Sequence, residues 1–179
     1  QSALQNAQET YNKEKGGENM AYEIAPAMPG DLDRVLEIYA YARKFMAQNG
    51  NPHQWGTVTP KKSLLEEDME RKQLSVVREN GVIHGVFVFF LGEDPTYKKI
   101  YEGAWHKNVP YGTIHRIASD GSGGIFSACL EYCSKRSDYL RIDTHKDNHI
   151  MQHVVEKAGF RRCGIIYIAD GTPRIAYDR

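Results

Sequence analysis

Three glycines occupy four consecutive positions, 121–124, between a strand pattern and a helix pattern. Tyr111 to Ala118 before them is rich in β-branched and aromatic residues, and residues 125–135 after them read as a helix. Residues without Cβ atoms let backbone N–H groups converge on an anion, and the dipole of a following helix favours negative charge. The segment therefore predicts a strand, a turn suited to a diphosphate, and a helix. It is not a P-loop, because no Gly-Lys-Ser/Thr follows, and it lacks the G-x-G-x-x-G order of a dinucleotide fold.

Further strand and helix patterns flank this turn. We expect strands at residues 22–26, 74–78, 82–91, 111–118, 140–144, 160–168 and 173–177, and helices at about 31–48, 59–72, 125–135 and 148–158. Asn80-Gly81 between two strand patterns is typical of a tight hairpin, and Asp170-Gly171 joins the last two strands in the same way. The chain is therefore predicted to be a mixed α/β (α+β) protein.

Composition narrows the class of protein. A chain of 179 residues suits one domain with a sizeable core, and Lys plus Arg equal Asp plus Glu at 23 each, so no net charge attracts nucleic acid or an anionic membrane. The three cysteines are too few for a disulfide framework, and the longest apolar run, Val86 to Leu91, is too short to span a membrane. We therefore expect a cytoplasmic protein.

Residues 1–20 are polar and show no strong apolar period. We interpret them as an N-terminal extension, either lying ahead of the natural start or added to it. The folded domain is expected to cover residues 21–179.

The order of these parts, closing with Asn148 to Phe160 (NHIMQHVVEKAGF), resembles the GCN5-related N-acetyltransferase (GNAT) family over about residues 21–178. The closing stretch is similar to the family's Asn…Leu-Tyr-Glu-Lys-x-Gly-Phe. The family's phosphate turn reads Gln/Arg-x-x-Gly-x-Gly/Ala, and of that pattern Gly121 to Phe126 keeps only the central glycine, Gly124. The resemblance implies acetyl-CoA as co-substrate and a mixed, mostly antiparallel central sheet flanked by helices.

The resemblance also implies where the coenzyme binds. In the family the turn holds the pyrophosphate, and a backbone N–H of the fourth strand faces the acetyl oxygen, which by position is the N–H of Ile117. The residues expected to contact the coenzyme are Ile117, Gly121, Ser122, Gly123, Gly124, Ile125, Phe126 and Asn148.

Acetyl transfer needs an unprotonated amine, so a proton acceptor is required. His115 and His145 are the candidates for this base or its water relay, and a satisfied structural histidine is the alternative for each. The family's tyrosine that protonates the departing thiolate is matched by Val155, and Tyr167 is the candidate substitute. A missing acid costs only about 2 kcal/mol, because a thiol of pKa near 8.5 leaves readily as thiolate.

Aromatic residues are the candidates for an acceptor pocket. Trp55 lies in the predicted loop at residues 49–56, and Tyr101 and Trp105 lie in the long connection at 92–110. Together with Tyr97 the last two are four residues apart, as if on one face of a short helix. The alternative is that they cover the edge of the core. The expected acceptor is a small-molecule amine or a peptide, and a homodimer is left open.

Two other clusters are interpreted as structural. His145, His149 and His153 recur every four residues, but no H-E-x-x-H pattern accompanies them, so we expect no metal. Asp143 and its charged neighbours near the cap of the following helix are interpreted as a solvated face.

The sequence thus predicts an acetyl-CoA-dependent N-acetyltransferase that acts by direct attack in a ternary complex. One alternative is a non-catalytic module that binds or senses acyl-CoA, motivated by Val155 and the degenerate phosphate turn. Another is an α/β interaction protein whose glycine turn binds nothing.

Overall fold

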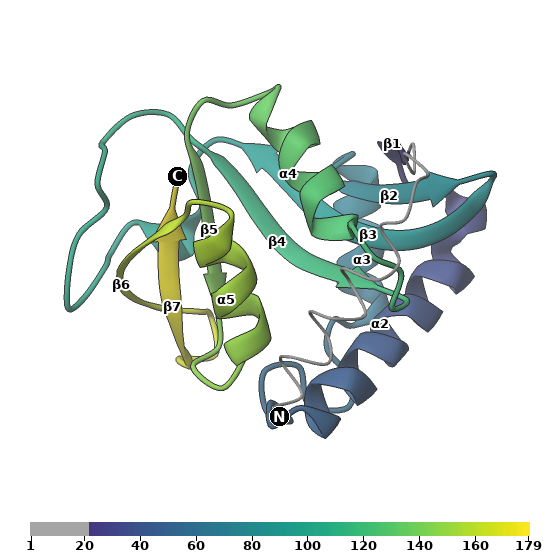
Figure 1. Cartoon of the computed structure of the whole chain (residues 1–179), viewed down its shortest axis with the longest axis horizontal. Coiled ribbons are helices and arrows are strands. Elements are labelled where there is room, and N and C mark those ends of the chain that lie inside the picture. The colour runs from purple at the N-terminus through teal and green to yellow at the C-terminus, as the bar shows by residue number, and fades with distance from the viewer. Residues whose placement is uncertain (1–21) are drawn as a thin grey trace.

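The computed structural model describes residues 22–179, so the predicted extension at residues 1–20 lies outside the described part of the chain. Figure 1 shows the arrangement of the elements. In chain order they are β1 (Glu23–Pro26), the 3₁₀ turn η1 (Pro29–Asp31), α2 (Leu32–Gln48), α3 (Lys62–Glu70), β2 (Leu74–Glu79), β3 (Val82–Leu91), the 3₁₀ turn η2 (Pro95–Tyr97), β4 (Gly112–Ser119), α4 (Ile125–Ser134), β5 (Leu140–Thr144), α5 (His149–Lys157), β6 (Arg161–Tyr167) and β7 (Pro173–Asp178).

The strands form one sheet in the order β1-β2-β3-β4-β5-β7-β6. Neighbouring strands are antiparallel except β4 and β5, which run parallel. The expectation of a mixed, mostly antiparallel sheet flanked by helices is confirmed.

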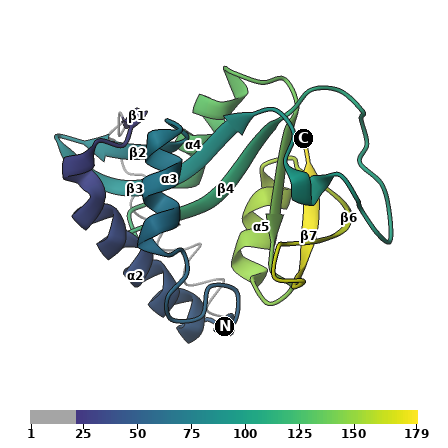
Figure 2. The same cartoon turned by 180° about the vertical axis from the view of Figure 1, so that it is seen from behind.

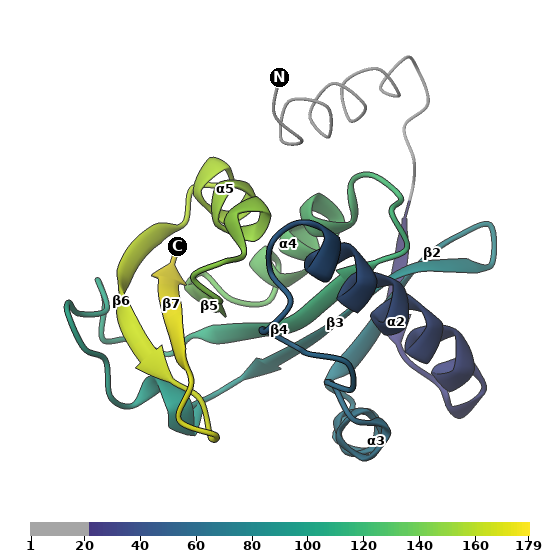
Figure 3. The same ribbon diagram turned by 90° about the horizontal axis from the view of Figure 1, so that it is seen from below.

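Helices cover both faces of the sheet. In Figure 2, α2 and α3 lie in front of β2, β3 and β4, and Figure 3 shows α4 and α5 on the side of the sheet opposite α3. Two of the three apolar cores of the described residues follow from this layering. Under α2 and α3 the core contains Val35, Ile38, Leu65, Val76 and Val88, and under α4 and α5 it contains Phe87, Ile114, Cys129, Val155 and Ile175.

Two turns have the backbone conformations that their residue types predict. Asn80 and Gly81 both have positive φ (49° and 80°), as a tight two-residue hairpin requires, and they join β2 to β3. At the end of α5, Gly159 has φ +90°, and the N–H of Phe160 donates to the carbonyl of Val155 at 3.1 Å.

Two predictions about element boundaries differ from the structure. The second helix begins at Lys62 rather than near residue 59, because Lys61 before it is still extended (φ −70°, ψ 148°). The segment at 92–110 contains only the single turn η2 and no helix through Tyr101. Tyr101 instead pairs with Ile165 of β6, each N–H donating to the other's carbonyl at 2.8 Å. The exposed edge of β6 thus takes up the segment as a partner.

Across residues 22–179, no helix combines the length and apolar character that a membrane span requires.

Candidate active site

Strands β4 and β5 diverge along their length (Figure 1). The two strands pair over only three residues, the last pair being Ile114 with Ile142. Gly112 suits the closely paired end, because a Cβ there would lie 2.6 Å from the ring of Phe89. Beyond this point a cleft of about 1510 Å³ extends between the strands and is lined also by the helices beside them. That volume accommodates a ligand larger than most drug-sized molecules.

β4 carries a bulge just past the point of separation. The register with β3 shifts after His115, so Arg116 and Ile117 together lie opposite one residue of β3. Arg116 has φ +50°, a conformation that needs support from its surroundings. The Tyr39 hydroxyl donates to the Arg116 carbonyl at 2.7 Å, and the Arg116 guanidinium donates to the Asp68 carboxylate at 2.7 Å. Helices α2 and α3 therefore hold the bulge in place.

The glycine loop, residues 119–124, connects β4 to α4. Gly121 and Gly124 have φ +98° and +79°, where only glycine is free of strain. A Cβ on residue 121 would lie 2.8 Å from the Tyr41 hydroxyl, so a side chain there would require Tyr41 to move. Within residues 22–179, no side chain caps the N-terminus of α4. The first backbone N–H groups of this helix are therefore free to bind a ligand.

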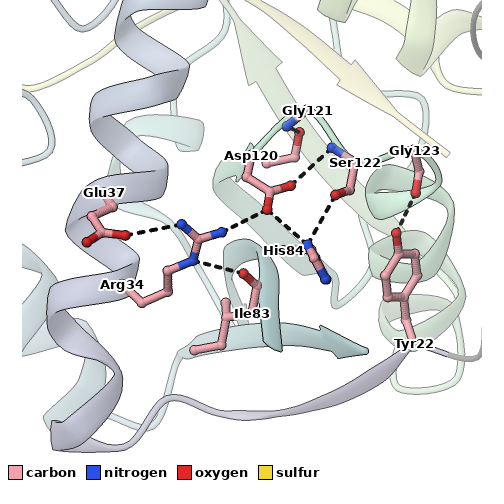
Figure 4. A network of polar contacts seen from close by, with 10 residues as sticks. Tyr22, Arg34, Glu37, Ile83, His84, Asp120, Gly121, Ser122 and Gly123 are labelled. Atoms are coloured by element: carbon pink, nitrogen blue, oxygen red, sulfur yellow. Dashed lines mark hydrogen bonds and ion pairs between the residues drawn. The ribbon is translucent and has the colours of Figure 1, made fainter. Parts of the chain in front are cut away.

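A polar network holds this loop from behind (Figure 4). The Asp120 carboxylate accepts from the Arg34 guanidinium of α2 at 2.8 Å and from the Ser122 backbone N–H at 3.1 Å. Nδ1 of His84, on β3, lies 2.9 Å from the same carboxylate and 3.1 Å from the Ser122 hydroxyl. Asp120 therefore joins the loop to α2 and to β3.

Hydrogen bonds keep the Asp120 carboxylate ionised. Burial raises the pKa of Asp120, but the hydrogen bonds from Ser122 and His84 outweigh it and hold the pKa below its ordinary value of 3.8. Asp120 is therefore ionised at neutral pH. The Tyr22 hydroxyl, just before β1, donates to the Gly123 carbonyl at 2.7 Å and adds a third anchor.

His115 on β4 lies in the cleft between two carboxylates. Its Nε2 is 2.5 Å from Oδ2 of Asp94, and its Nδ1 is 3.5 Å from Oδ2 of Asp143. Other groups hold both carboxylates: the Tyr97 hydroxyl donates to Asp143 at 2.7 Å, and the backbone N–H and hydroxyl of Thr96 donate to Asp94 at 2.8 and 2.7 Å. Both ring nitrogens of His115 thus face carboxylates that Thr96 and Tyr97 hold in position.

Hydrogen bonds set the protonation of two groups around His115. Burial raises the pKa of Asp94, but the hydrogen bonds from His115 and Thr96 outweigh it and lower the pKa. Burial, followed by the charge of Asp143, raises the pKa of Tyr97 well above its usual range, so that its hydroxyl keeps its proton. Asp94 is therefore ionised at neutral pH, and the Tyr97 hydroxyl acts as a donor to Asp143.

Most residues predicted for the coenzyme site line the cleft, and so does Trp55. Those that line it are Trp55, His115, Ile117, Gly121, Gly123, Ile125, Phe126 and Asn148. Ser122 and Gly124 belong to the same loop without lining the cleft themselves. Asn148 has a second role as the cap of α5, because its Oδ1 accepts from the N–H of Met151 at 3.1 Å.

His145 does not join this group. It follows β5 directly, is 7% exposed, and lies outside the lining of the cleft that residues 22–179 form. Its Nδ1 accepts from the N–H of Asp147 at 3.2 Å, which ties the ring to the turn before α5. Burial, followed by the positive charge of Arg174, lowers its pKa.

Tyr101, Trp105 and Tyr167 also lie away from the cleft lining that the described residues form. The exposed rings of Tyr101 and Tyr167 meet edge to face, 5.2 Å apart, beside the edge strand β6. The indole N–H of Trp105 donates to the Tyr97 carbonyl at 3.0 Å, and the Arg141 guanidinium stacks on the indole ring at 4.0 Å. The structure therefore does not bring these aromatic residues to the site expected for them: Tyr101 pairs with β6, Trp105 packs against Arg141, and Tyr167 lies on β6 itself.

Sequence reasoning missed the two carboxylates around His115. The interpretation of Asp143 as part of a solvated face is wrong, since its side chain is only 11% exposed and accepts from Tyr97. Asp94 precedes Pro95, a pairing that predicts the cap of a short helical turn. Its contact with His115, 21 positions away, depends on the sheet and has no local signal.

Comparison with known proteins places this architecture among acetyltransferases. No protein-family model and no curated protein matches the chain. A GNAT-family acetyltransferase from Streptococcus agalactiae 2603 is 29% identical with a TM-score of 0.79, over 88% of this chain and 94% of that one. A GNAT-family acetyltransferase from Listeria monocytogenes 4b F2365 is 13% identical with a TM-score of 0.65, over 88% and 94%. The yncA protein of Salmonella typhimurium, whose structure contains its cofactor acetyl-CoA, is 15% identical with a TM-score of 0.58, over 89% and 93%.

Proposed function

Because this chain belongs to the GCN5-related N-acetyltransferase family of acetyltransferases, we propose that it transfers the acetyl group of acetyl-CoA to an amine of a small molecule or peptide. The transfer proceeds by direct attack of the amine in a ternary complex. The observation that carries this proposal is the course of β4. This strand separates from β5, presents His115 to the resulting cleft, and runs directly into the braced glycine loop.

The residues present fit the coenzyme. Gly121 and Gly124 place no side chains at the two loop positions that have positive φ. Within residues 22–179, no side chain caps the N-terminus of α4. In this proposal the loop N–H groups hold the diphosphate and the N–H of Ile117, which has no register partner on β3 or β5, faces the acetyl carbonyl. Acetyl-CoA supplies an acetyl group activated as a thioester.

His115 is the proposed proton acceptor. An amine of pKa near 10.4 is neutral in only about one molecule in 2,500 at pH 7, so removing its proton is a large part of the work. His115 lines the cleft and has a carboxylate beside each ring nitrogen, whereas His145 is tied to a turn outside it. Asp94 and Asp143 lie beside the two ring nitrogens of His115 and hold the ring in place, which makes them positioning residues.

One observation favours a second candidate, the acyl-CoA-binding module without catalysis. Val155, at the position of the family's tyrosine, is 1% exposed and packs in the core under α4 and α5. The two proposals differ in whether thiol is released, since a binding module retains acetyl-CoA intact.

The test measures release of free thiol from acetyl-CoA with a panel of amines. It compares the native protein with His115→Gln and with the matched control His153→Gln, because His153 is an exposed residue of α5. We expect His115→Gln to lower kcat by roughly 100-fold or more at pH 7, and the deficit to shrink at higher pH as the amine loses its own proton. His153→Gln should behave like the native protein. Thermal stabilisation by acetyl-CoA without thiol release from any amine would support the binding module instead.

A further inference from the structure

Arg174 on β7 is a buried cation that lines the cleft without a carboxylate partner. Arg174 is only 6% exposed. Its guanidinium donates to the carbonyls of Pro173 at 3.0 Å and Gln54 at 3.3 Å. Among residues 22–179 no carboxylate oxygen lies within 4.0 Å of the guanidinium. By contrast Arg116, in the same cleft, pairs with Asp68 at 2.7 Å.

An unpaired buried guanidinium calls for an explanation, because charged side chains are rarely buried without a partner. Burial lowers the pKa of Arg174, while the more distant charges of Asp143 and Asp170 oppose that effect. The group nevertheless stays protonated at neutral pH. The two carbonyls engage only part of its five N–H donors, and neutral acceptors do not compensate the charge.

Arg174 and His115 point to the same face of the sheet. Their neighbours Ile175 and Ile114 both lie in the core under α4 and α5, so alternation turns Arg174 and His115 to the opposite face. One strand, β5, separates their two strands, which puts the backbones roughly 10 Å or more apart. A ligand that reaches both side chains therefore has its two recognised groups several bonds apart.

We propose that Arg174 binds a carboxylate of the acceptor, so that the acceptors are amines that also carry a carboxylate, such as ω-amino acids and peptides with a free C-terminus. A carboxylate matches the planar fork of a guanidinium and supplies the direct charge contact that the more distant Asp143 and Asp170 do not. This inference rests on the proposed acetyl transfer and specifies its substrate class. The amine lies toward His115, and the carboxylate lies toward Arg174.

The test compares each acceptor with its own primary amide, using dipeptides and ω-amino acids of several lengths. Dipeptides are the sharpest pairs, because both members carry an α-amine of pKa about 8. For the native protein we expect kcat/KM to favour the carboxylate by roughly 10- to 100-fold, as loss of a hydrogen bond to a charged group predicts. In Arg174→Gln the preference should fall to about one, with amide turnover retained.

Arg71→Gln is the matched control, since Arg71 lines the same cleft but is exposed and pairs with Glu67 at 4.0 Å. It should keep the preference for carboxylates. Thermal stabilisation by the best dipeptide, without acetyl-CoA, gives a readout independent of turnover, and Arg174→Lys tests the charge if Arg174→Gln does not fold. Acetyl transfer with equal rates for acids and amides in the native protein would overturn this inference alone. Absence of transfer to every amine would overturn the proposed function.

Discussion

At the scale of single residues, the cleft has a proposed proton acceptor, His115, but no phenol where the family has one. Val155 lies in the core, whereas Met151 and Val154 of the same helix line the cleft. Tyr167, the candidate substitute, packs against Tyr101 beside the edge strand β6. In the proposed reaction the thiolate therefore leaves without help from either position, at a cost of about 2 kcal/mol at pH 7.

We predict that kcat/KM for the acceptor rises with pH as the amine or the base loses its proton, and then stays level up to pH values near 10. Tyr167→Phe should leave this profile unchanged. Tyr41→Phe is the matched variant, because Tyr41 does line the cleft beside Gly121. A falling limb near the pKa of a phenol that disappears in Tyr167→Phe would make Tyr167 the acid.

At the scale of elements, the glycine loop depends on its neighbours. Gly121 stands where the family has arginine or glutamine, and the space for a side chain there is occupied by the Tyr41 hydroxyl. Contacts to Arg34 of α2, His84 of β3 and Tyr22 before β1 hold the loop instead (Figure 4). Binding at such a loop depends on its being held in one conformation before the ligand arrives.

We predict that Asp120→Asn raises the KM for acetyl-CoA by roughly 10-fold, because the charged hydrogen bonds to Arg34 and His84 are lost. The KM for the acceptor should change little, since Asp120 does not line the cleft formed by residues 22–179. Steady-state kinetics with each substrate varied in turn measure both constants. The control is Asp138→Asn, an exposed aspartate after α4. Equal changes in both KM values would mean that the loop does not act through the coenzyme.

At the scale of the whole molecule, the buried carboxylate of Asp178 on β7 ties the connection at 92–110 and the residue before β5 to the C-terminal strands. Its fully buried carboxylate accepts from the backbone N–H of His106 at 2.8 Å and from the Tyr139 hydroxyl at 2.5 Å. Burial raises the pKa of Asp178, but the hydrogen bonds from Tyr139 and His106 outweigh it and hold the pKa below 3.8.

A folded-state pKa below the unfolded value means that the unfolded chain binds more protons in acid. The contribution of Asp178 to the free energy of unfolding is therefore present above about pH 4 and is lost as the pH falls through the folded-state value. We predict that Asp178→Asn lowers stability at pH 7 by roughly 1–3 kcal/mol and flattens the loss of stability in acid. Urea unfolding from pH 7 down to pH 3 measures this, with Asp138→Asn as the control. A slope in acid equal to that of the native protein would contradict the assignment.

The sequence by itself determined most of the local structure, because the signals for it lie within a few residues. Asn80-Gly81 specified its hairpin, Asn148 and Gly159 bounded α5, and the strand, glycine turn and helix at 111–135 appeared in the predicted order. The same segments carried the family resemblance, which supplied the sheet that the structure confirmed. The helix expected through Tyr101 was wrong, since its spacing signal was weaker than pairing with an exposed strand edge.

Only the tertiary structure decided which side chains meet in the cleft. Asp94 reaches His115 across 21 positions, Tyr39 reaches the Arg116 carbonyl across 77, and Arg174 reaches the Gln54 carbonyl across 120. Such contacts depend on strand order, on register and on the bulge in β4, and a shift of one residue in a strand turns every side chain to the other face. No window of sequence contains that information, because packing of the whole chain sets the register.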